Sequence, residues 1–263
     1  MNKVTKFAIV SRDDSESIKI SKDIQRYLFN NGMAYADKDP DIVCVVGGDG
    51  TFLTAIHKYI NKLDQVVFAA VNTGTLGFFA DYTVEELDQY VSDIVNKQPN
   101  IEKKKLLKIT VNGKERKTYL AVNEMRIENV IKTQTIDVYI NEKKLETYRG
   151  TGLCVCTQVG STAYNRSLRG AVVEAGMEIM ELTEITGIHH IHYRSLGVPI
   201  IMSGNNTIRM LSRYDDTSLL CFDRYAINLD GAESIETTLS DVEFKVARYR
   251  KTDYIDHLYH LYT

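Results

Sequence analysis

The sequence predicts an α/β domain followed by a mainly β domain, because the spacing of its apolar residues changes near residue 100. Before this point, continuous apolar runs alternate with segments of helical periodicity, an order typical of an open, Rossmann-like α/β sheet. After Pro99, short alternating strands dominate as far as about residue 247. We therefore expect an α/β domain over residues 1–99, a β domain over residues 100–247, and a tail over residues 248–263 that packs on the first domain or at an interface.

Three strands are expected in the first domain, each a continuous apolar run of the kind that is covered on both faces of a parallel sheet. They are Phe7–Val10, Ile42–Val46 and Val66–Val71. Because strands alternate with helices here, ligands are expected outside the carboxyl ends of the strands.

Three helices are expected between and after these strands. The first should begin at Ser15, end before Gly32 and carry an apolar face of Ile18, Ile24, Tyr27 and Leu28. The second should carry Phe52, Leu53, Ile56, Tyr59 and Ile60. The third follows a capping box of Thr83 and Glu86, and its apolar residues are Leu87, Val91, Ile94 and Val95.

The second domain should begin with a β-hairpin. Residues 107–111 alternate in polarity, Asn112-Gly113 is typical of a two-residue hairpin turn, and the chain returns through Tyr119–Val122. Further strands are expected over Ile136–Ile140, Leu153–Thr157, Ile208–Leu211, Leu219–Phe222 and Val242–Val246. The segment Val172–Ile185 fits either a helix or a strand.

The composition is that of an ordinary globular protein, with 44% hydrophobic and 25% charged residues and a net charge of −3. No broad basic surface for nucleic acid is predicted. No apolar run approaches the roughly 20 residues that cross a bilayer, and the N-terminus does not resemble a signal peptide. We therefore expect a cytoplasmic protein without nucleic-acid or membrane partners. Its cysteines lie in apolar runs and are interpreted as buried free thiols: Cys44, Cys154, Cys156 and Cys221.

A glycine-rich segment, Val46-Gly47-Gly48-Asp49-Gly50-Thr51, joins the second expected strand to the second helix. Glycines at this point let backbone N–H groups approach a phosphate, and the helix N-terminus favours the anion. A carboxylate would repel phosphate unless it had a task there. Asp49 could orient or deprotonate an attacking hydroxyl, or could hold Mg²⁺ against the phosphates, and phosphoryl transfer needs both.

Two commoner phosphate-binding loops are excluded by the residues themselves. A Walker A loop ends in Gly-Lys-Ser/Thr, and no lysine occurs between Gly47 and His57. The dinucleotide fingerprint G-x-G-x-x-G would need a glycine where Leu53 stands.

Four segments together resemble the NAD kinase family, which shares its glycine-rich motif with diacylglycerol kinases, sphingosine kinases and 6-phosphofructokinases. Gly47–Thr51 is similar to the family's GGDGT loop, and Asn72–Phe78 to its NTGxLGF loop. Asn123-Glu124 resembles the Asn-Glu pair of its β domain. Gly160–Asn165, with Ser167 and Gly170, resembles its second glycine-rich block. The order and spacing agree over nearly the whole chain.

The resemblance implies an ATP-dependent kinase that phosphorylates the adenosine ribose 2′-hydroxyl of NAD. Asp49 would activate that hydroxyl, and phosphates would be held by Gly47, Gly48, Gly50 and Thr51. NAD would contact Asp49, Gly50, Phe78, Asn123, Glu124, Thr162, Ala163 and Tyr164. Mg²⁺ would arrive with the ATP phosphates rather than on a set of side chains. The family also implies a β-sandwich-like second domain and a homodimer or homotetramer.

Four positions of the second block depart from the family pattern. Thr151 stands where relatives have aspartate, Gln158-Val159 where they have proline and a hydroxyl residue, and Arg169 where they have glycine. Since Asp49 and Asn123-Glu124 are retained, we expect these departures to affect affinity or substrate choice rather than the chemistry.

Simpler interpretations remain open for some residues. Asn123-Glu124 alone also fits a solvated strand edge, and Tyr164 also fits a core aromatic residue. The histidines of His189–His192 are too close together to share one ion easily, so a loop or subunit contact is expected there. For the whole chain, the alternatives are a lipid kinase of the diacylglycerol or sphingosine type and a catalytically weakened dinucleotide-binding paralogue.

Overall fold

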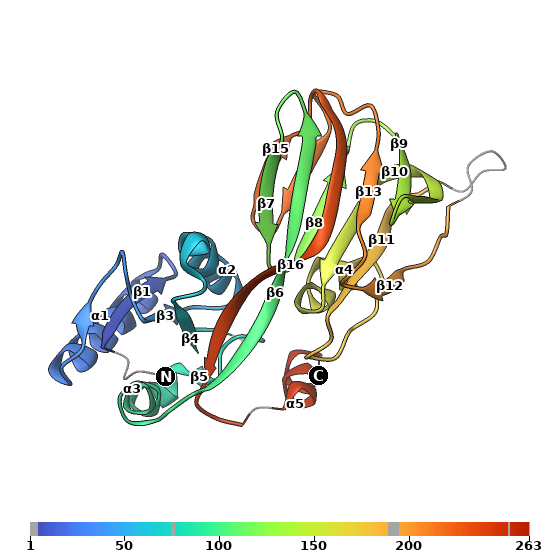
Figure 1. Cartoon of the computed structure of the whole chain (residues 1–263). Coiled ribbons are helices and arrows are strands. Elements are labelled where there is room, and N and C mark those ends of the chain that lie inside the picture. Colours follow the sequence, from blue (N-terminus) through green and yellow to red (C-terminus); the bar gives the residue numbers. More distant parts are fainter. Residues whose placement is uncertain (1–4, 75–76, 189–194, 252, 263) are drawn as a thin grey trace. The chain divides into compact units, whose positions relative to one another are not determined.

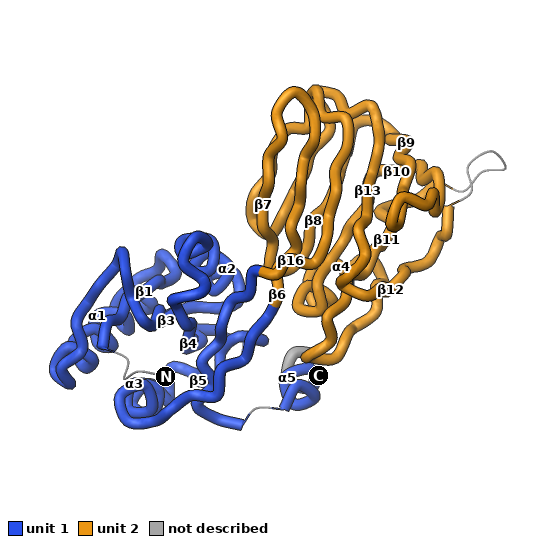
Figure 2. Tube along the Cα trace, viewed as in Figure 1, with its two compact units in different colours: residues 1–104, 242–263 blue, residues 105–241 orange. Residues whose placement is uncertain are grey.

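Two compact units make up the chain in the computed structural model, which describes residues 5–74, 77–188, 195–251 and 253–262. Unit 1 comprises residues 1–104 and 242–263, and unit 2 comprises residues 105–241 (Figure 2). Two long strands, β6 (Asn100–Gly113) and β16 (Ala232–Arg248), each begin in one unit and end in the other (Figure 1). The last residues of β16 therefore belong to unit 1, although the apolar pattern groups them with the second domain.

Unit 1 is built on a parallel sheet in the order β5-β4-β3-β1-β2. Its strands are β1 (Lys6–Ser11), β2 (Ala34–Tyr35), β3 (Ile42–Val46), β4 (Val67–Asn72) and β5 (Tyr82–Thr83). The end of β16 also pairs with β4 in parallel, with Lys245 beside Val67. The expected α/β class is thus confirmed, and all five residues of β3 are buried as a strand covered on both faces requires.

Helices cover both faces of this sheet. The side chains of β4 show this, because successive side chains along a strand point to opposite faces. Val67, Ala69 and Val71 share a core with residues of α1 and α3. Phe68, on the opposite face, lies with its ring centroid 5.8 Å from that of Phe52 on α2. The helices are α1 (Ser15–Asn30), α2 (Asp49–Lys58), α3 (Leu87–Asn96) and α5 (Tyr254–Tyr262), with short 3-10 turns η1 (Ile60–Lys62) and η2 (Val84–Glu86).

The helix ends follow the expected signals, but the buried face of α1 does not. The capping box of Thr83 and Glu86 is present ahead of α3, and Gly32 follows α1 with a φ of 81°. The apolar side chains that α1 buries are Ile20, Ile24 and Leu28. Ile18 and Tyr27 are exposed, so the prediction that they lie on the buried face was wrong. The buried apolar residues are spaced four apart, beginning at Ile20, and so lie along one side of the helix.

Unit 2 consists of antiparallel strands that share one core. The strands besides parts of β6 and β16 are β7 (Lys117–Ala121), β8 (Glu124–Glu128), β9 (Gln134–Ile140), β10 (Lys143–Thr157), β11 (Ile179–Gly187), β12 (Ile200–Ser203), β13 (Ile208–Leu211), β14 (Leu219–Phe222) and β15 (Tyr225–Asn228). Ile109, Ile136, Leu153, Met210 and Leu220, all fully buried, come from five of them and pack in a single cluster. This arrangement agrees with the expected β-sandwich-like fold.

The ambiguous segment and the first hairpin differ from simple expectation. Residues 171–178 have no regular structure, and β11 follows, so Val172–Ile185 contains a strand and no helix. β6 and β7 form the expected hairpin, but Val111 pairs with Lys117, so β6 runs through Gly113 and the chain turns over residues 114–116. The prediction of a turn at Asn112-Gly113 was therefore wrong by two residues.

All four cysteines are free, and Cys44, Cys154 and Cys156 are buried whereas Cys221 is partly exposed. In the ranges that the structure describes, no helix is long and apolar enough to span a membrane.

Candidate functional site

The glycine turn between β3 and α2 has a backbone that a larger residue would not adopt. Gly47 has a φ of 147°, and a Cβ on it would lie 2.4 Å from the Thr51 hydroxyl oxygen. Its N–H donates to the carbonyl of Val71 at 3.0 Å, which ties the turn to the end of β4. Gly48 then serves as the N-cap of α2, and Asp49 is the first residue of the helix. This places the expected phosphate-binding residues Gly47, Gly48, Gly50 and Thr51 around one helix N-terminus.

The Asp49 carboxylate is fixed by the loop that follows β4. Its Oδ2 accepts the N–H of Phe78 at 3.1 Å, and its Oδ1 accepts the N–H of Phe79 at 3.3 Å. A Cβ on Gly77 would lie 2.2 Å from Oδ1, so only glycine lets the loop come this close. Burial raises the pKa of Asp49 even though these hydrogen bonds oppose the rise.

The Phe78 ring, expected to stack on a base, has neighbours within unit 1. Its centroid lies 5.9 Å from that of Tyr254 and 6.3 Å from that of His257, both on α5. The Nδ1 atom of His257 lies 3.1 Å from the carbonyl oxygen of Gly77. The C-terminal helix thus packs on the loop that carries Phe78. Residues 75 and 76 of the same motif lie outside the described residues.

In unit 2, Asp223 holds the chain where Asn123 and Glu124 enter β8. The Asp223 carboxylate accepts the N–H groups of Val122 and Asn123, each at 2.8 Å. Asp223 also donates its own N–H to the Glu124 carbonyl at 3.2 Å. The backbone of the Asn-Glu pair is therefore held by Asp223 at the start of β8, rather than lying at a solvated strand edge.

Glu124 is a buried acid with an unused oxygen. Its Oε2 atom has no hydrogen-bond partner among the described residues. Burial, together with the nearby Asp223 charge, raises the pKa of Glu124 to about 7, although the Arg126 charge and the Tyr164 backbone oppose the rise. A buried oxygen without a partner is uncommon, and this one keeps its full capacity for a further hydrogen bond.

The second glycine-rich block packs directly against this turn. A Cβ on Gly160 would lie 2.0 Å from the carbonyl oxygen of Asn123, so the block can lie here only with glycine at that point. Gly160 belongs to η3 (Val159–Thr162), and α4 (Tyr164–Ser167) follows Ala163. The expected NAD-binding residues Asn123, Glu124, Thr162, Ala163 and Tyr164 are thereby brought into one region of unit 2.

Tyr164 is partly exposed and lies beneath an arginine. The guanidinium of Arg126 is 3.9 Å from the centre of the Tyr164 ring, and its Nη1 donates to Glu128 at 2.5 Å. Tyr164 is therefore not a fully buried core residue, and one face of its ring packs against the guanidinium.

A buried polar network supports α4 from below. Asn165 donates to Glu181 at 2.8 Å and accepts from the Thr183 hydroxyl at 2.7 Å. The second oxygen of Glu181 accepts the N–H of Ala171 at 2.8 Å. Gly170 lies against the Asn165 amide, where a Cβ would be 2.1 Å from its nitrogen.

The residues that depart from the family pattern make contacts within unit 2. The Thr151 hydroxyl donates to the Ile185 carbonyl at 2.9 Å, and the Gln158 amide donates to the Val173 carbonyl at 2.8 Å. Arg169 is exposed and has a φ of 64°, a conformation that glycine adopts more easily.

Two polar residues near these sites were not expected from the sequence: Asp223 in unit 2 and Arg248 in unit 1. Arg248 donates to the carbonyl of Phe78 and to Asp81. Each is an ordinary charged residue far along the chain from its partner, so no local pattern marks it.

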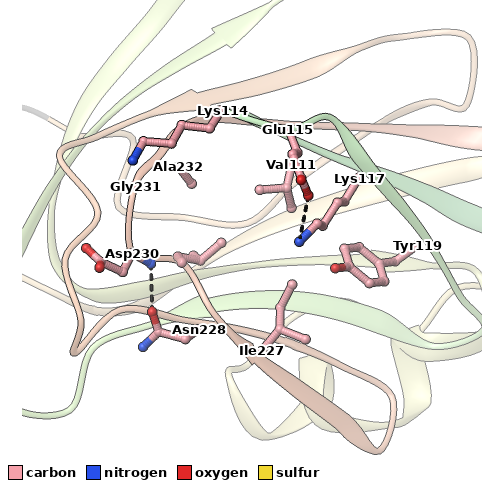
Figure 3. Close-up of a pocket in the computed structure, with 12 residues that line it drawn as sticks. Val111, Lys114, Glu115, Lys117, Tyr119, Ile227, Asn228, Asp230, Gly231 and Ala232 are labelled. Carbon is pink, nitrogen blue, oxygen red and sulfur yellow. Dashed lines mark hydrogen bonds and ion pairs between the residues drawn. The ribbon is translucent and has the colours of Figure 1, made fainter.

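A cavity of about 500 Å³ opens in unit 2 between the turn from β6 to β7 and the end of β15 (Figure 3). Its charged lining includes Lys114, Lys117, Glu115 and Asp230, and Lys117 pairs with Glu115 at 3.3 Å. None of the expected site residues lines it.

No group of three or more His, Cys, Asp or Glu side chains suited to a metal ion occurs among the described residues. The segment His189–His192 lies outside them, so its expected loop or subunit contact remains a prediction.

Comparison with known proteins identifies the family. A model of the ATP-NAD kinase N-terminal domain matches residues 4–99, and a model of the ATP-NAD kinase C-terminal domain matches residues 121–249. The chain is 35% identical over 251 residues to an NAD kinase from Lactobacillus gasseri, covering 95% of this chain and 94% of that protein. It is 34% identical over 247 residues to an NAD kinase from Geobacillus stearothermophilus, covering 93% and 91% of the two chains.

Two solved structures share the fold. Yeast NADH kinase complexed with NADH matches with a TM-score of 0.86 at 18% identity, covering 99% of this chain and 88% of that one. An NAD kinase from Archaeoglobus fulgidus in complex with ATP matches with a TM-score of 0.76 at 20% identity, covering 94% and 95%. Since both family models and the relatives extend over both units, the chain belongs to the ATP-NAD kinase family.

Proposed function

We propose that this chain transfers the γ-phosphoryl group of ATP to the adenosine ribose 2′-hydroxyl of NAD and so produces NADP. Membership of the ATP-NAD kinase family supports a phosphotransferase that acts on NAD. The observation that carries the proposal for this chain is the Asp49 carboxylate, held by two backbone N–H groups at the start of α2. A lipid kinase is not favoured, because both family models are those of ATP-NAD kinases.

Asp49 would take the proton of the 2′-hydroxyl as the oxygen attacks the γ-phosphorus. The new phosphorus–oxygen bond would form while the bond to the β-phosphate oxygen breaks, and ADP would leave. Each carboxylate oxygen accepts one backbone N–H and keeps lone-pair capacity for the substrate hydroxyl. Burial raises the pKa of Asp49 towards neutral pH. A general base is most effective when its pKa lies near the working pH.

Gly47, Gly48, Gly50 and Thr51 would bind phosphate through the helix N-terminus. Mg²⁺ would be carried by the ATP phosphates rather than by a set of side chains. That mode fits the ion, which keeps several waters and binds nucleotide phosphates with few protein ligands. The bound ion would neutralise charge on the transferred group.

NAD would use Asn123, Glu124, Thr162, Ala163 and Tyr164, together with Asp49, Gly50 and Phe78 of unit 1. The buried Oε2 of Glu124, which has no partner in the described structure, supports a hydrogen bond to a ribose hydroxyl or an amide. The small residues of η3 and the partly exposed Tyr164 ring, one face of which lies against Arg126, suit a flat base.

A cytoplasmic homodimer or homotetramer, without nucleic-acid or membrane partners, completes the proposal. Four free thiols suit a reducing compartment. Exposed apolar side chains before β11, before β12 and in β12 suit a contact between copies: Met177, Leu196, Val198 and Ile201.

The test is ATP-dependent formation of NADP by the purified protein, with NADH, diacylglycerol and sphingosine as parallel acceptors. We expect product from the dinucleotide, loss of activity with a chelator and recovery with Mg²⁺. Phosphorylated lipid would instead identify a lipid kinase. Calorimetric binding of NAD without any product would identify a weakened paralogue.

A further inference from the structure

The side chain of Arg248, near the end of β16, reaches the loop that holds Asp49. Its Nη2 donates to the carbonyl of Phe78 at 3.0 Å, and its Nη1 donates to the carbonyl of Phe79 at 3.1 Å. The N–H groups of the same two residues donate to the Asp49 carboxylate. Asp49 and Arg248 therefore hold opposite polar groups of one dipeptide.

Arg248 is itself fixed by two acids. Its Nη1 pairs with Asp81 at 2.6 Å and its Nε with Glu102 at 2.9 Å. Only 10% of the Arg248 side chain and 4% of the Asp81 side chain are exposed. The planar guanidinium can make all four contacts at once, whereas a lysine ammonium has a different shape and no such fork.

We propose that Arg248 is a positioning residue for phosphoryl transfer: it holds Phe78 and Phe79 so that their amides fix Asp49 against the substrate hydroxyl. This inference rests on the proposed function of Asp49. Arg248 makes no hydrogen bond to the Asp49 carboxylate among the described residues, although its charge also lowers the pKa of Asp49. Its contacts with the Phe78 and Phe79 carbonyls are the means by which it would position Asp49.

Two other basic residues of the C-terminal segment do not hold this dipeptide in the same way. His257 of α5 also faces Asp49, but its ring contacts the Gly77 carbonyl rather than those of Phe78 and Phe79. Arg250, two residues after Arg248, pairs with Glu86 at 2.6 Å and lies 3.9 Å from the centre of the Tyr82 ring. Arg250 is thus a matched arginine without contact to either carbonyl among its hydrogen bonds.

The test variant is Arg248→Gln in an Asp81→Asn background, because removing the arginine alone would leave Asp81 buried without its partner. Asp81→Asn alone is the reference, and Arg250→Gln in the same background is the control. We expect kcat to fall about 10²-fold with Arg248→Gln, the loss that a displacement of roughly 1 Å produces. The control should change kcat by less than about threefold.

A double-mutant cycle with Asp49→Asn shows whether Arg248 acts through Asp49. If it does, Arg248→Gln should lower the residual kcat of Asp49→Asn by less than about threefold, because residues that act as a unit are not additive. An equal loss in both backgrounds, or an equal loss with Arg250→Gln, would overturn the proposal.

Hydrogen exchange of the Phe78 and Phe79 amides tests the same link without activity. We expect exchange at least tenfold faster in Arg248→Gln than in Arg250→Gln, since local opening sets the rate. Equal rates would contradict the proposal even in an active enzyme. A wild-type protein that makes no NADP would refute the proposed function separately, because the exchange comparison does not depend on turnover.

Discussion

At the level of single residues, Asp49 makes the most direct prediction. Asp49→Asn keeps the side-chain shape but turns one accepting oxygen into a donor that faces a backbone N–H. We expect turnover to fall by roughly 10²–10⁴, the usual contribution of a general base. The dissociation constant for NAD, measured by calorimetry, should change far less.

The matched control is Asp93→Asn. Asp93 is a buried aspartate of the same unit, and its carboxylate accepts hydrogen bonds from Tyr82 and Lys97. This variant should retain turnover. Because the pKa of Asp49 is raised, the wild-type rate should fall as pH drops through a value above the usual range for aspartate. Wild-type turnover in Asp49→Asn would remove this residue from the mechanism.

Glu124 should make stability depend on pH. Its pKa is about 7 in the folded chain, above the value near 4.3 of an unfolded glutamate. The folded state therefore favours the protonated acid, so this contribution is complete below the unfolded pKa and is lost as pH rises through about 7. Glu124→Gln, which stays neutral, should be more stable than wild type at pH 8, by a free energy of unfolding on the order of 3 kcal/mol.

Urea denaturation of wild type and Glu124→Gln at pH 5 and pH 8 measures this difference. At pH 5, which is still above the unfolded pKa, the difference should fall to about 1 kcal/mol. Glu115→Gln, at an exposed glutamate in the turn after β6, should show no pH-dependent gain. A constant difference at both pH values would mean that Glu124 does not titrate in this range.

At the level of elements, the turn after α4 contains a residue in an unfavourable backbone conformation. Arg169 adopts a φ of 64° directly after this short helix, and Gly170 donates its N–H back to the Asn165 carbonyl. A residue with a Cβ pays about 1–2 kcal/mol for a left-handed conformation, and glycine's larger entropy in the unfolded chain offsets part of that difference. Arg169→Gly should therefore stabilise the protein by about 0.5–1 kcal/mol.

Thermal denaturation compares this variant with Arg166→Gly, which introduces glycine inside α4 and should destabilise. If both variants lower the midpoint, Arg169 contributes contacts that outweigh its backbone conformation. A gain without any change in the Michaelis constant for NAD would show that this departure from the family pattern concerns the turn and not the substrate.

The elements that could be predicted are those specified by neighbouring residues. Ile42–Val46 was predicted with its observed bounds because burial on both faces leaves a continuous apolar run. The hairpin turn was misplaced because β6 continues through Gly113 and β7 begins only at Lys117, so the chain turns over residues 114–116. A two-residue hairpin turn does occur elsewhere in unit 2. Asn141 and Glu142, with φ values of 48° and 66°, form it between β9 and β10.

The candidate site divides in the same way. Gly47–Thr51 and Asn123-Glu124 could be found because their glycines, acids and amides lie within a few residues of one another. Asp223 and Arg248 could not, since each acts on backbone groups about 100 or 170 positions away. Only the folded chain brings these ordinary charged residues to the segments they hold.

At the level of the whole molecule, unit 1 is formed by two segments that are far apart in the sequence, residues 1–104 and 242–263. The last part of β16 pairs with β4, and this part of the strand together with the residue after it contributes buried side chains to unit 1: Phe244, Val246, Ala247 and Tyr249. Phe244 lies among the rings of Phe52 and Phe79, with centroids 6.4 and 6.0 Å away. Unit 1 therefore needs residues 242–249 for its core, whereas α5 lies beyond them.

Two truncations separate these contributions. A chain ending at residue 241 loses three large buried side chains and one alanine, each large one worth about 1.5–3 kcal/mol, or roughly 5–9 kcal/mol together. Since whole domains are stable by only about 5–15 kcal/mol, unit 1 should unfold while unit 2 keeps its own core. A chain ending at residue 250 keeps both cores and Arg248, and loses the contacts of α5 with Gly77 and Phe78. Amide NMR spectra should then show dispersed signals from both units in the chain that ends at residue 250. In the chain that ends at residue 241, only unit 2 should give dispersed signals. Dispersed signals from β1, β3 and β4 in the shorter chain would mean that the parallel sheet is stable without β16.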